Sequence, residues 1–450
     1  MPSTSEEPDP LEPAALVGEP RRHDPYASLR DPRLRNYLAG NMLAIVGMQM
    51  EMMALRYELY DRTNSALPLG LMGLAQVLPV LALMLLAGHV ADRFNRKIVL
   101  VSALSTTLCA ALGLAAVSHW QGPIVAVYGC LAINGVGRAF LQPAKQSLLP
   151  QLTRPENFSN AVTWGSGVFH LGSVIGPALA GWALAATASP ALIYLTNAAA
   201  IGAFILLLAP VKFRATPVDN EAVTVDSLLA GVRYVWGAEV VFGAMALDMF
   251  AVLLGGAVAL LPVFARDVLG VGPVGLGWME TAPALGSVLM SVVLAHRPPL
   301  RHAGHYLLWA VAGFGVTMIV FGLSRSFVLS LFVLFLSGAL DNVSVVIRQT
   351  LVQLQTPDAM RGRVSAVNSM FIGMSNELGG FESGVTADWF GKVASVVGGG
   401  IGTLAVVALA AWRWPKLRRF DRLDAPLETP DNAHSPARAN EPASAEQVVA

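Results

Sequence analysis

Residues 88–97 of the chain read Gly88-His89-Val90-Ala91-Asp92-Arg93-Phe94-Asn95-Arg96-Lys97, a polar and basic stretch between two long apolar runs. Those runs cover residues 67–89 and 98–118, and an apolar run of about 20 residues crosses a lipid bilayer as a helix. The stretch therefore connects two membrane-spanning helices. Within it, Asp92 can pair with the basic side chains or cap a neighbouring helix, and Gly88 permits close approach of helices.

The same alternation of apolar runs and short polar connections continues along most of the chain. Hydrophobic residues make up 54% of the sequence and charged residues 13%, whereas soluble domains carry about 25% charged residues. The chain therefore needs lipid as part of its solvent, and it is predicted to be an all-α membrane protein with twelve transmembrane helices. The predicted spans are residues 36–60, 67–89, 98–118, 122–143, 160–186, 189–210, 238–264, 271–295, 304–323, 327–347, 364–387 and 394–412.

A polar segment between the sixth and seventh spans divides the chain into two six-helix halves. The stretch from Lys145 to Leu149 is similar to the stretch from Arg348 to Val352 at the equivalent place in the second half. The halves are therefore predicted to be parallel repeats, an arrangement in which two halves rock about a site between them. The predicted organisation is a disordered cytoplasmic tail at 1–35, a half at 36–210, a cytoplasmic linker at 211–237, a half at 238–413 and a cytoplasmic tail at 414–450.

The basic residues predict the orientation of the chain in the membrane. If both tails and every second connection are cytoplasmic, that side holds 24 of the 30 Lys and Arg residues, and the other side holds four. Because cytoplasmic connections are enriched in Lys and Arg, both termini are predicted to be cytoplasmic. This count places Arg348 in the connection after the tenth span. The expected location is the inner membrane of a bacterial cell, as a multi-pass protein.

The connection at residues 88–97 resembles the signature loop of the major facilitator superfamily, in which a glycine is followed by Asp-Arg and a basic pair. The resemblance implies the major facilitator fold and a latch that holds one conformation closed on the cytoplasmic side. The equivalent stretch of the second half has lost most of the pattern, so no latch is expected there. The latch residues are Gly88, Asp92, Arg93, Arg96 and Lys97.

The fifth span resembles the motif that antiporters of the superfamily carry in this helix. Gly172 and Gly176 give it a face of small residues, and Pro177 removes a backbone donor and can kink the helix. With Gly181, these residues are expected to form a hinge or seal, and simple close packing of helices is the alternative. Ala180 stands where a glycine is common in the motif.

Several connecting stretches resemble one branch of the superfamily, which contains the enterobactin (siderophore) exporters. The resemblance implies efflux of a siderophore or a similar amphipathic compound. It supports kinship more strongly than it fixes a substrate. The stretches are Asp61–Ser65, Leu228–Tyr234 and Gln355–Met360.

Ionisable residues inside the spans are costly, and they are therefore the candidates for substrate or proton binding. A carboxyl group in a cavity of low dielectric constant favours its protonated form, so it can exchange a proton as the cavity opens to each side. This reasoning predicts proton antiport. The candidates are Glu51, Arg138, Asp248, Glu280, Asp341 and Glu377.

The sequence shows no arrangement of residues typical of an enzyme, and it holds no phosphate-binding loop of the G-x-x-x-x-G-K type, so it predicts a secondary transporter rather than an enzyme or a primary ATP-driven pump. No cofactor and no metal site are expected, and a formal net charge of zero gives no sign of nucleic-acid binding. The expected partners are a small-molecule substrate, protons and membrane lipid, with the protein acting as a monomer. A proton-coupled exporter is the leading hypothesis. Multidrug efflux, import, or a non-transporting membrane receptor on the same fold remain the alternatives.

Overall fold

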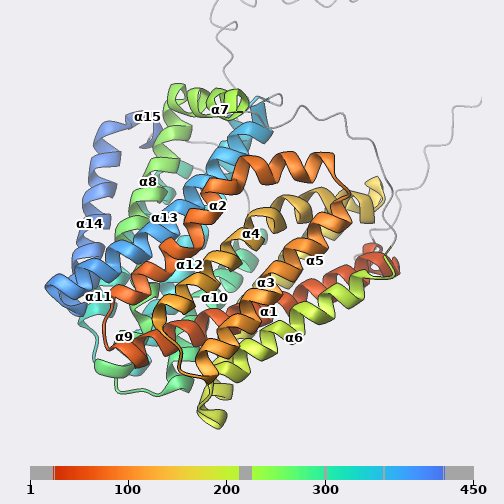
Figure 1. Ribbon diagram of the computed structural model, residues 1–450. Coiled ribbons are helices and arrows are strands. Elements are labelled where there is room, and N and C mark those ends of the chain that lie inside the picture. The colour runs from red at the N-terminus through yellow and green to blue at the C-terminus, as the bar shows by residue number, and fades with distance from the viewer. Residues whose placement is uncertain are drawn as a thin grey trace, which may run out of the picture.

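The computed structural model describes residue 24 and residues 26–211, 225–297, 302–357, 360–418 and 420. The described residues form α-helices and short 3₁₀ helices, with no β-strand among them, as the composition predicts. Figure 1 shows the long helices packed as one bundle, with α7 lying across one of its ends. Most of the predicted tails, residues 1–23 and 421–450, and residues 212–224 of the predicted linker lie outside the described residues.

The first six helices pack with one another. Helix α1 contacts α5 and α6, α3 contacts α4 and α6, and α2 contacts α4. This set is called the first group below. Its helices are α1 (Pro32–Thr63), α2 (Leu67–Arg93), α3 (Arg96–His119), α4 (Ile124–Leu152), α5 (Phe158–Thr187) and α6 (Pro190–Leu208).

The remaining helices form a second group. Helix α10 packs against α12, α11 packs against α12 and α14, and α8 packs against α13 and α14. The pairs α5 with α10 and α2 with α13 join the two groups. The second group comprises α7 (Val225–Gly237), α8 (Glu239–Gly255), α9 (Leu261–Asp267), α10 (Pro273–Ala295), α11 (Ala303–Leu323), α12 (Phe327–Leu354), α13 (Arg361–Phe390), α14 (Lys392–Arg413) and α15 (Pro415–Arg418).

Eleven segments among the described residues are long and apolar enough to cross a membrane. One of them, Glu239–Asp267, combines α8, the 3₁₀ helix Ala257–Leu260 and α9. Helix α13 has 30 residues and packs among the others, but its polar residues keep it out of this set. The predicted count of twelve spans therefore requires that α13 also cross the membrane. A polar helix can do so when its polar side chains face other protein groups instead of lipid.

Several helix ends are set by residues that the local sequence supplies. The Asp31 side chain accepts a hydrogen bond from the Arg33 backbone at 2.8 Å and so caps α1, which begins at Pro32. Asn95 caps α3 in the same way by accepting from the Lys97 backbone at 3.0 Å. These caps satisfy backbone donors that the first turn of a helix leaves without partners.

The buried apolar residues form three clusters, and their positions describe how the groups meet. The tail end of the bundle is defined here as the end where α1 begins and α14 ends, and the distal end is the opposite one. At the tail end each group has its own cluster, around Leu100 and Leu148 in the first group and Val241 and Leu307 in the second.

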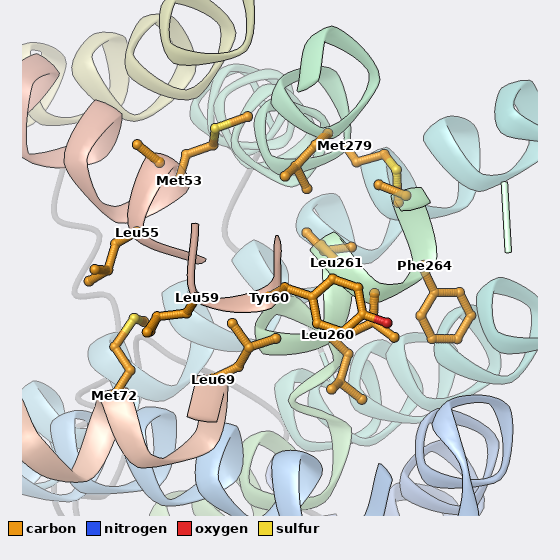
Figure 2. Packing of buried hydrophobic residues seen from close by; sticks show 14 of the residues in the cluster. Met53, Leu55, Leu59, Tyr60, Leu69, Met72, Leu260, Leu261, Phe264 and Met279 are labelled. Atoms are coloured by element: carbon orange, nitrogen blue, oxygen red, sulfur yellow. The ribbon is translucent and has the colours of Figure 1, made fainter. Parts of the chain in front are cut away.

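At the distal end a single cluster includes residues of both groups. Figure 2 shows part of it, in which Leu59 and Leu69 of the first group lie near Leu260 and Leu261 of the second. The groups therefore share an apolar core at the distal end and have separate cores at the tail end. Among the described residues, burial of apolar surface therefore holds the groups together on the distal side.

Candidate functional site

Charged and polar side chains at the distal end join the two groups. Arg56 of α1 lies 3.0 Å from Glu280 of α10, and the Glu280 side chain is only 5% exposed. Nearer the end of the bundle, Arg266 lies 3.1 Å from Asp61 in a more exposed pair. Tyr60 also donates to Asp267.

All hydrogen bonds and ion pairs that join the two groups among the described residues lie in the distal half. The most central is the bond from the Thr281 hydroxyl to the Val174 carbonyl oxygen, at 3.2 Å. The structure is therefore closed at its distal end.

Glycines allow the backbones of the two groups to touch at this closure. A Cβ atom at Gly181 of α5 would lie 2.7 Å from the Pro273 carbonyl oxygen, and one at Gly277 of α10 would lie 2.6 Å from the Pro177 carbonyl oxygen. On the other side of the bundle, a Cβ at Gly384 of α13 would lie within 3.0 Å of the backbone of α2. No larger residue fits at these positions without separating the helices.

The predicted hinge or seal residues of the fifth span, which is α5, thus make two kinds of contact, one within the first group and one with the second group. Gly176 packs within the first group, where a Cβ atom would lie 2.9 Å from the Val46 carbonyl oxygen of α1, and Gly172 packs against Ile45 of the same helix. Pro177 and Gly181 instead face α10 of the second group.

A cavity of about 570 Å³, called the central cavity, lies between the two groups on the tail side of the closure. Its wall includes Gly255, Gly256 and Ala257, where the spanning segment changes from α-helix to 3₁₀ helix. Interrupted helices of this kind commonly line transporter sites, because their backbone groups become available to a ligand. The ionisable residues of the wall are Arg56, Asp341 and Glu377.

Two predicted carboxyl residues, Asp341 and Glu377, thus face the central cavity. Neither side chain forms a hydrogen bond or a close ion pair with another residue in the described part of the chain. Asp341 interacts electrostatically with Asp248 and Arg348, and Glu377 interacts with Arg56 and Arg138. Glu377 also lies beside α2, where a Cβ at Gly73 would be 2.7 Å from its Oε2 atom.

Asp248, the candidate of α8, does not line the cavity. It is 6% exposed and lies 3.1 Å from the Arg348 guanidinium, which also donates to Asn368 at 3.0 Å. The sequence predicts that Arg348 lies in a cytoplasmic connection. Helix α12 continues to Leu354, however, and carries Arg348 into the interior of the second group.

Glu51 and Glu280 are also held by fixed partners. Glu51 is fully buried in the first group, where the side-chain amides of Asn134 and Asn197 donate to its two oxygens at 3.3 and 2.6 Å. Glu280 belongs to the distal ion pair with Arg56.

A second cavity of about 490 Å³ lies in the first group and is called the Lys145 cavity. It contains Arg138, whose guanidinium donates to the Gln76 side chain at 2.6 Å, and Lys145, which donates to Asn41 at 2.8 Å. Phe169 lines both this cavity and the central one. Lys145 is not among the candidates predicted from the sequence, because it follows the fourth apolar run and counts as a basic residue of a connection. Its position eleven residues after Asn134 and seven after Arg138, on one face of a helix, is the signal that identifies it.

The predicted latch residues lie where α2 ends and α3 begins. Lys97 donates to the carbonyl oxygens of Ala209 and Val211 at 2.8 and 2.9 Å, and it thereby ties α3 to the end of α6 within the first group. A Cβ at Gly88 would meet no described atom of another helix within 4 Å, so the close approach expected there is not made in this conformation. The Asp92 side chain lies outside the described part of the structure. The set comprises Gly88, Asp92 and Arg93 in α2 and Arg96 and Lys97 in α3.

A comparison with known protein families identifies the family to which this helical bundle belongs. The family model described as "Transmembrane secretion effector", of the major facilitator type, matches residues 23–441. The chain belongs to this family. As a family member it is a membrane-spanning secondary transporter of small molecules, and it is not an enzyme. Among its described residues, no group of three or more His, Cys, Asp and Glu side chains could hold a metal ion.

Curated relatives agree with this family membership. Proteins named enterobactin exporter EntS, from Escherichia coli O1:K1 and from Shigella boydii serotype 18, are 27% and 26% identical over 392 residues, covering 86% of this chain and 93% of each relative.

Two solved structures share the fold of this chain. A bacterial homologue of the iron transporter ferroportin, in an inward-facing state, has a TM-score of 0.67 at 18% identity, covering 87% of this chain and 99% of that chain. A bacterial homologue of the human lysosomal transporter Spinster has a TM-score of 0.66 at 14% identity, covering 88% and 98%. These likenesses confirm the predicted major facilitator fold.

Proposed function

We propose that the chain exports a siderophore-like or other amphipathic small molecule across the bacterial inner membrane, in exchange for protons. The observation that carries this proposal is the central cavity. It lies between the two groups, it is closed at the distal end, and it exposes Asp341 and Glu377 without fixed partners. The similarity to proteins named as enterobactin exporters supports the direction of transport and the class of substrate.

Transport would proceed by alternating access of a single protein molecule. The apolar core and the ion pairs that the described residues of the two groups share lie at the distal end, so rocking about the central cavity would open that end and bring the tail ends together. The basic connections support a cytoplasmic tail end. The structure then represents the state that accepts substrate from the cytoplasm.

Asp341 and Glu377 would carry the coupling protons. A residue that exchanges protons between the two sides has to meet the cavity in both states, and these two carboxyl groups line it directly. The Asp248, Glu280 and Glu51 side chains are engaged by Arg348, Arg56 and two amides, respectively. These three would therefore stabilise particular conformations.

The latch and the seal would act at opposite ends of the bundle. When the tail ends approach, the connection around Asp92 and Arg93 would meet the second group and stabilise the closed tail end. Gly181 and Pro177 would seal the distal end in the conformation described here. Each seal is made in one state only, so transport requires both.

Multidrug efflux is the second candidate. Its supporting observation is the composition of the central cavity, whose wall is formed mainly by glycine and apolar side chains such as Met72, Phe314 and Met318. Such a wall makes few directional contacts and can accept varied apolar compounds. A broad set of exported compounds would favour this alternative over a dedicated siderophore exporter.

Metabolite profiling of cells and medium tests the proposed function. Cells that produce the wild-type protein are compared with cells that produce the double variant Asp341→Asn/Glu377→Gln at the same level in the membrane. The proposal predicts one compound, or a small related set, that is enriched in the medium and depleted in the cells only with the wild-type protein. A compound enriched inside the cells instead would identify an importer, and no difference at all would remove the transport proposal.

A further inference from the structure

The Lys145 cavity contains two cationic side chains that form no close ion pair with a carboxylate among the described residues. Arg138 and Lys145 lie two turns apart on α4, about 10 Å along the helix axis, and both line the cavity. Their hydrogen-bond partners are the neutral amides of Gln76 and Asn41, and the Lys145 ammonium also lies 5.7 Å from the centre of the Phe204 ring. No carboxylate lies within ion-pair distance of either cation among the described residues.

Two carboxyl groups, Glu51 and Glu377, interact electrostatically with Arg138 without forming a close ion pair with it among the described residues. Glu51 interacts electrostatically with Arg138, but its side chain is fully buried and both its oxygens are engaged by Asn134 and Asn197. Among the described residues, Lys145 therefore faces the cavity with a neutral amide and an aromatic ring as its contacts and no carboxylate. A cation in such a low-dielectric site is costly unless an anion accompanies it.

The rest of the wall is suited to hold oxygen atoms. Asn41, Gln142 and Asn134 place side-chain amides around the same space, and amides can donate to anionic or carbonyl oxygens. Leu141 and Met48 supply apolar surface beside them. The combination of two cations, several amides and an apolar wall matches an aromatic or alkyl group that carries negatively charged oxygens.

We propose that the Lys145 cavity is an anion subsite, which binds a carboxylate or another oxygen-rich anionic group of the transported molecule through Lys145 and Arg138. The inference rests on the proposed transport function and specifies its substrate class. Phe169, which is 51% exposed, lines both cavities, so a molecule anchored at Lys145 would extend past it into the central cavity. Its anionic end would then lie in the first group and its apolar part beside Asp341 and Glu377.

Binding measurements without any ion gradient test this subsite. The purified full-length protein in lipid nanodiscs is titrated with three probes of matched size: 2-naphthoate, 2-naphthamide and 2-naphthylmethylammonium. The wild-type protein is expected to bind the anion about tenfold more tightly than the neutral amide, as charge-assisted hydrogen bonds imply. Lys145→Gln should abolish this preference, and Lys145→Arg should retain it.

A matched control removes a lysine elsewhere. Lys416 is paired with Glu239 at 2.9 Å and is 73% exposed, so Lys416→Gln should leave the preference for naphthoate unchanged. The unfolding temperature of each variant in nanodiscs shows whether it is folded, and Lys145→Arg provides a folded comparison if Lys145→Gln is unstable. The inference is overturned if the wild-type protein binds the three probes equally, or if folded Lys145→Gln keeps its preference for the anion.

The binding measurements and the metabolite profiling test the subsite and the transport function separately. A charge preference that depends on Lys145 while metabolite profiling finds no export would support the subsite and contradict the transport proposal. Export by the wild-type protein together with an unchanged preference in Lys145→Gln would contradict the subsite alone.

Discussion

The Arg348 guanidinium lies 3.1 Å from the Asp248 carboxylate, and both side chains are almost completely buried in the second group. The same guanidinium donates to Asn368, so one arginine links α12 to α8 and α13. Asp341, in contrast, has no such partner in the described part of the chain and faces the central cavity. Asp248 and Asp341, which are equivalent candidates by hydropathy, therefore occupy different environments in the structure.

Removing one member of the buried pair should destabilise the protein. Arg348→Met leaves the Asp248 carboxylate buried without its partner, which typically costs about 3–5 kcal/mol. The double variant Asp248→Asn/Arg348→Met should recover a large part of that loss. Unfolding temperatures in detergent measure the effect, and Arg325→Met serves as the control, because among the described residues its guanidinium bonds only to the Ser324 carbonyl oxygen. A double variant no more stable than Arg348→Met would show that the two residues are not energetically coupled.

A single methyl group at the distal seal should prevent full closure. Gly181→Ala places a Cβ atom 2.7 Å from a backbone oxygen of α10, and overpacking of this kind costs about 1–3 kcal/mol. We expect a longer distance between spin labels at Ala186 and Trp389, measured by pulsed electron paramagnetic resonance, and reduced transport. Gly202→Ala is the matched control because a Cβ there meets nothing within 4 Å. Equal label distances in both variants would contradict the seal.

The Arg56–Glu280 pair should stabilise the closed distal end more than the Asp61–Arg266 pair does. Glu280 is 5% exposed, whereas the side chains of the outer pair are 47% and 55% exposed, and solvent weakens exposed ion pairs. With the same spin labels, Glu280→Gln should raise the population of the distal-open state, and Asp61→Asn should change it little. The swapped variant Arg56→Glu/Glu280→Arg should restore closure. A larger effect of Asp61→Asn would reverse this ranking.

The orientation can be tested by labelling single cysteines. In a background with Cys109 and Cys130 replaced by serine, cysteines at Gln121 and Lys392 should react with an impermeant maleimide added to intact cells. Cysteines at Asn95 and Asp219 should react only after the membrane is permeabilised, and Asp219 lies in the predicted linker outside the described residues. Labelling with the opposite pattern would place the tail end outside the cell.

The positions of the helices could be predicted closely from the sequence. The predicted spans 98–118 and 304–323 correspond to Arg96–His119 and Ala303–Leu323, because a long apolar run has to cross the bilayer as a helix. Helix ends were less predictable where a helix continues beyond the apolar run. The span predicted to end at residue 347 continues to Leu354 and thereby buries Arg348.

The candidate site could be predicted only in part, because hydropathy does not specify contacts between helices. The hydropathy pattern identifies the carboxyl residues within the spans. It does not show that Glu280 pairs with Arg56 or that two side-chain amides bind Glu51. It also assigned Lys145 to a connection, since a lysine near the end of an apolar run looks like an ordinary positive-inside residue. Only the packing of α1, α4 and α6 places its ammonium group in a cavity.

The most direct test of the account measures transport in proteoliposomes with an imposed pH gradient, using the compound identified by metabolite profiling. The wild-type protein should drive uphill transport that a protonophore abolishes. Asp341→Asn should lose uphill transport and keep downhill exchange, because its cavity can still bind substrate and alternate without carrying a proton. Asp248→Asn should impair both modes together, because it disrupts a structural ion pair. If Asp341→Asn keeps full gradient-driven transport, Asp341 does not carry the coupling proton and Glu377 is the remaining candidate. If transport by the wild-type protein depends neither on the pH gradient nor on the protonophore, proton-coupled export is contradicted.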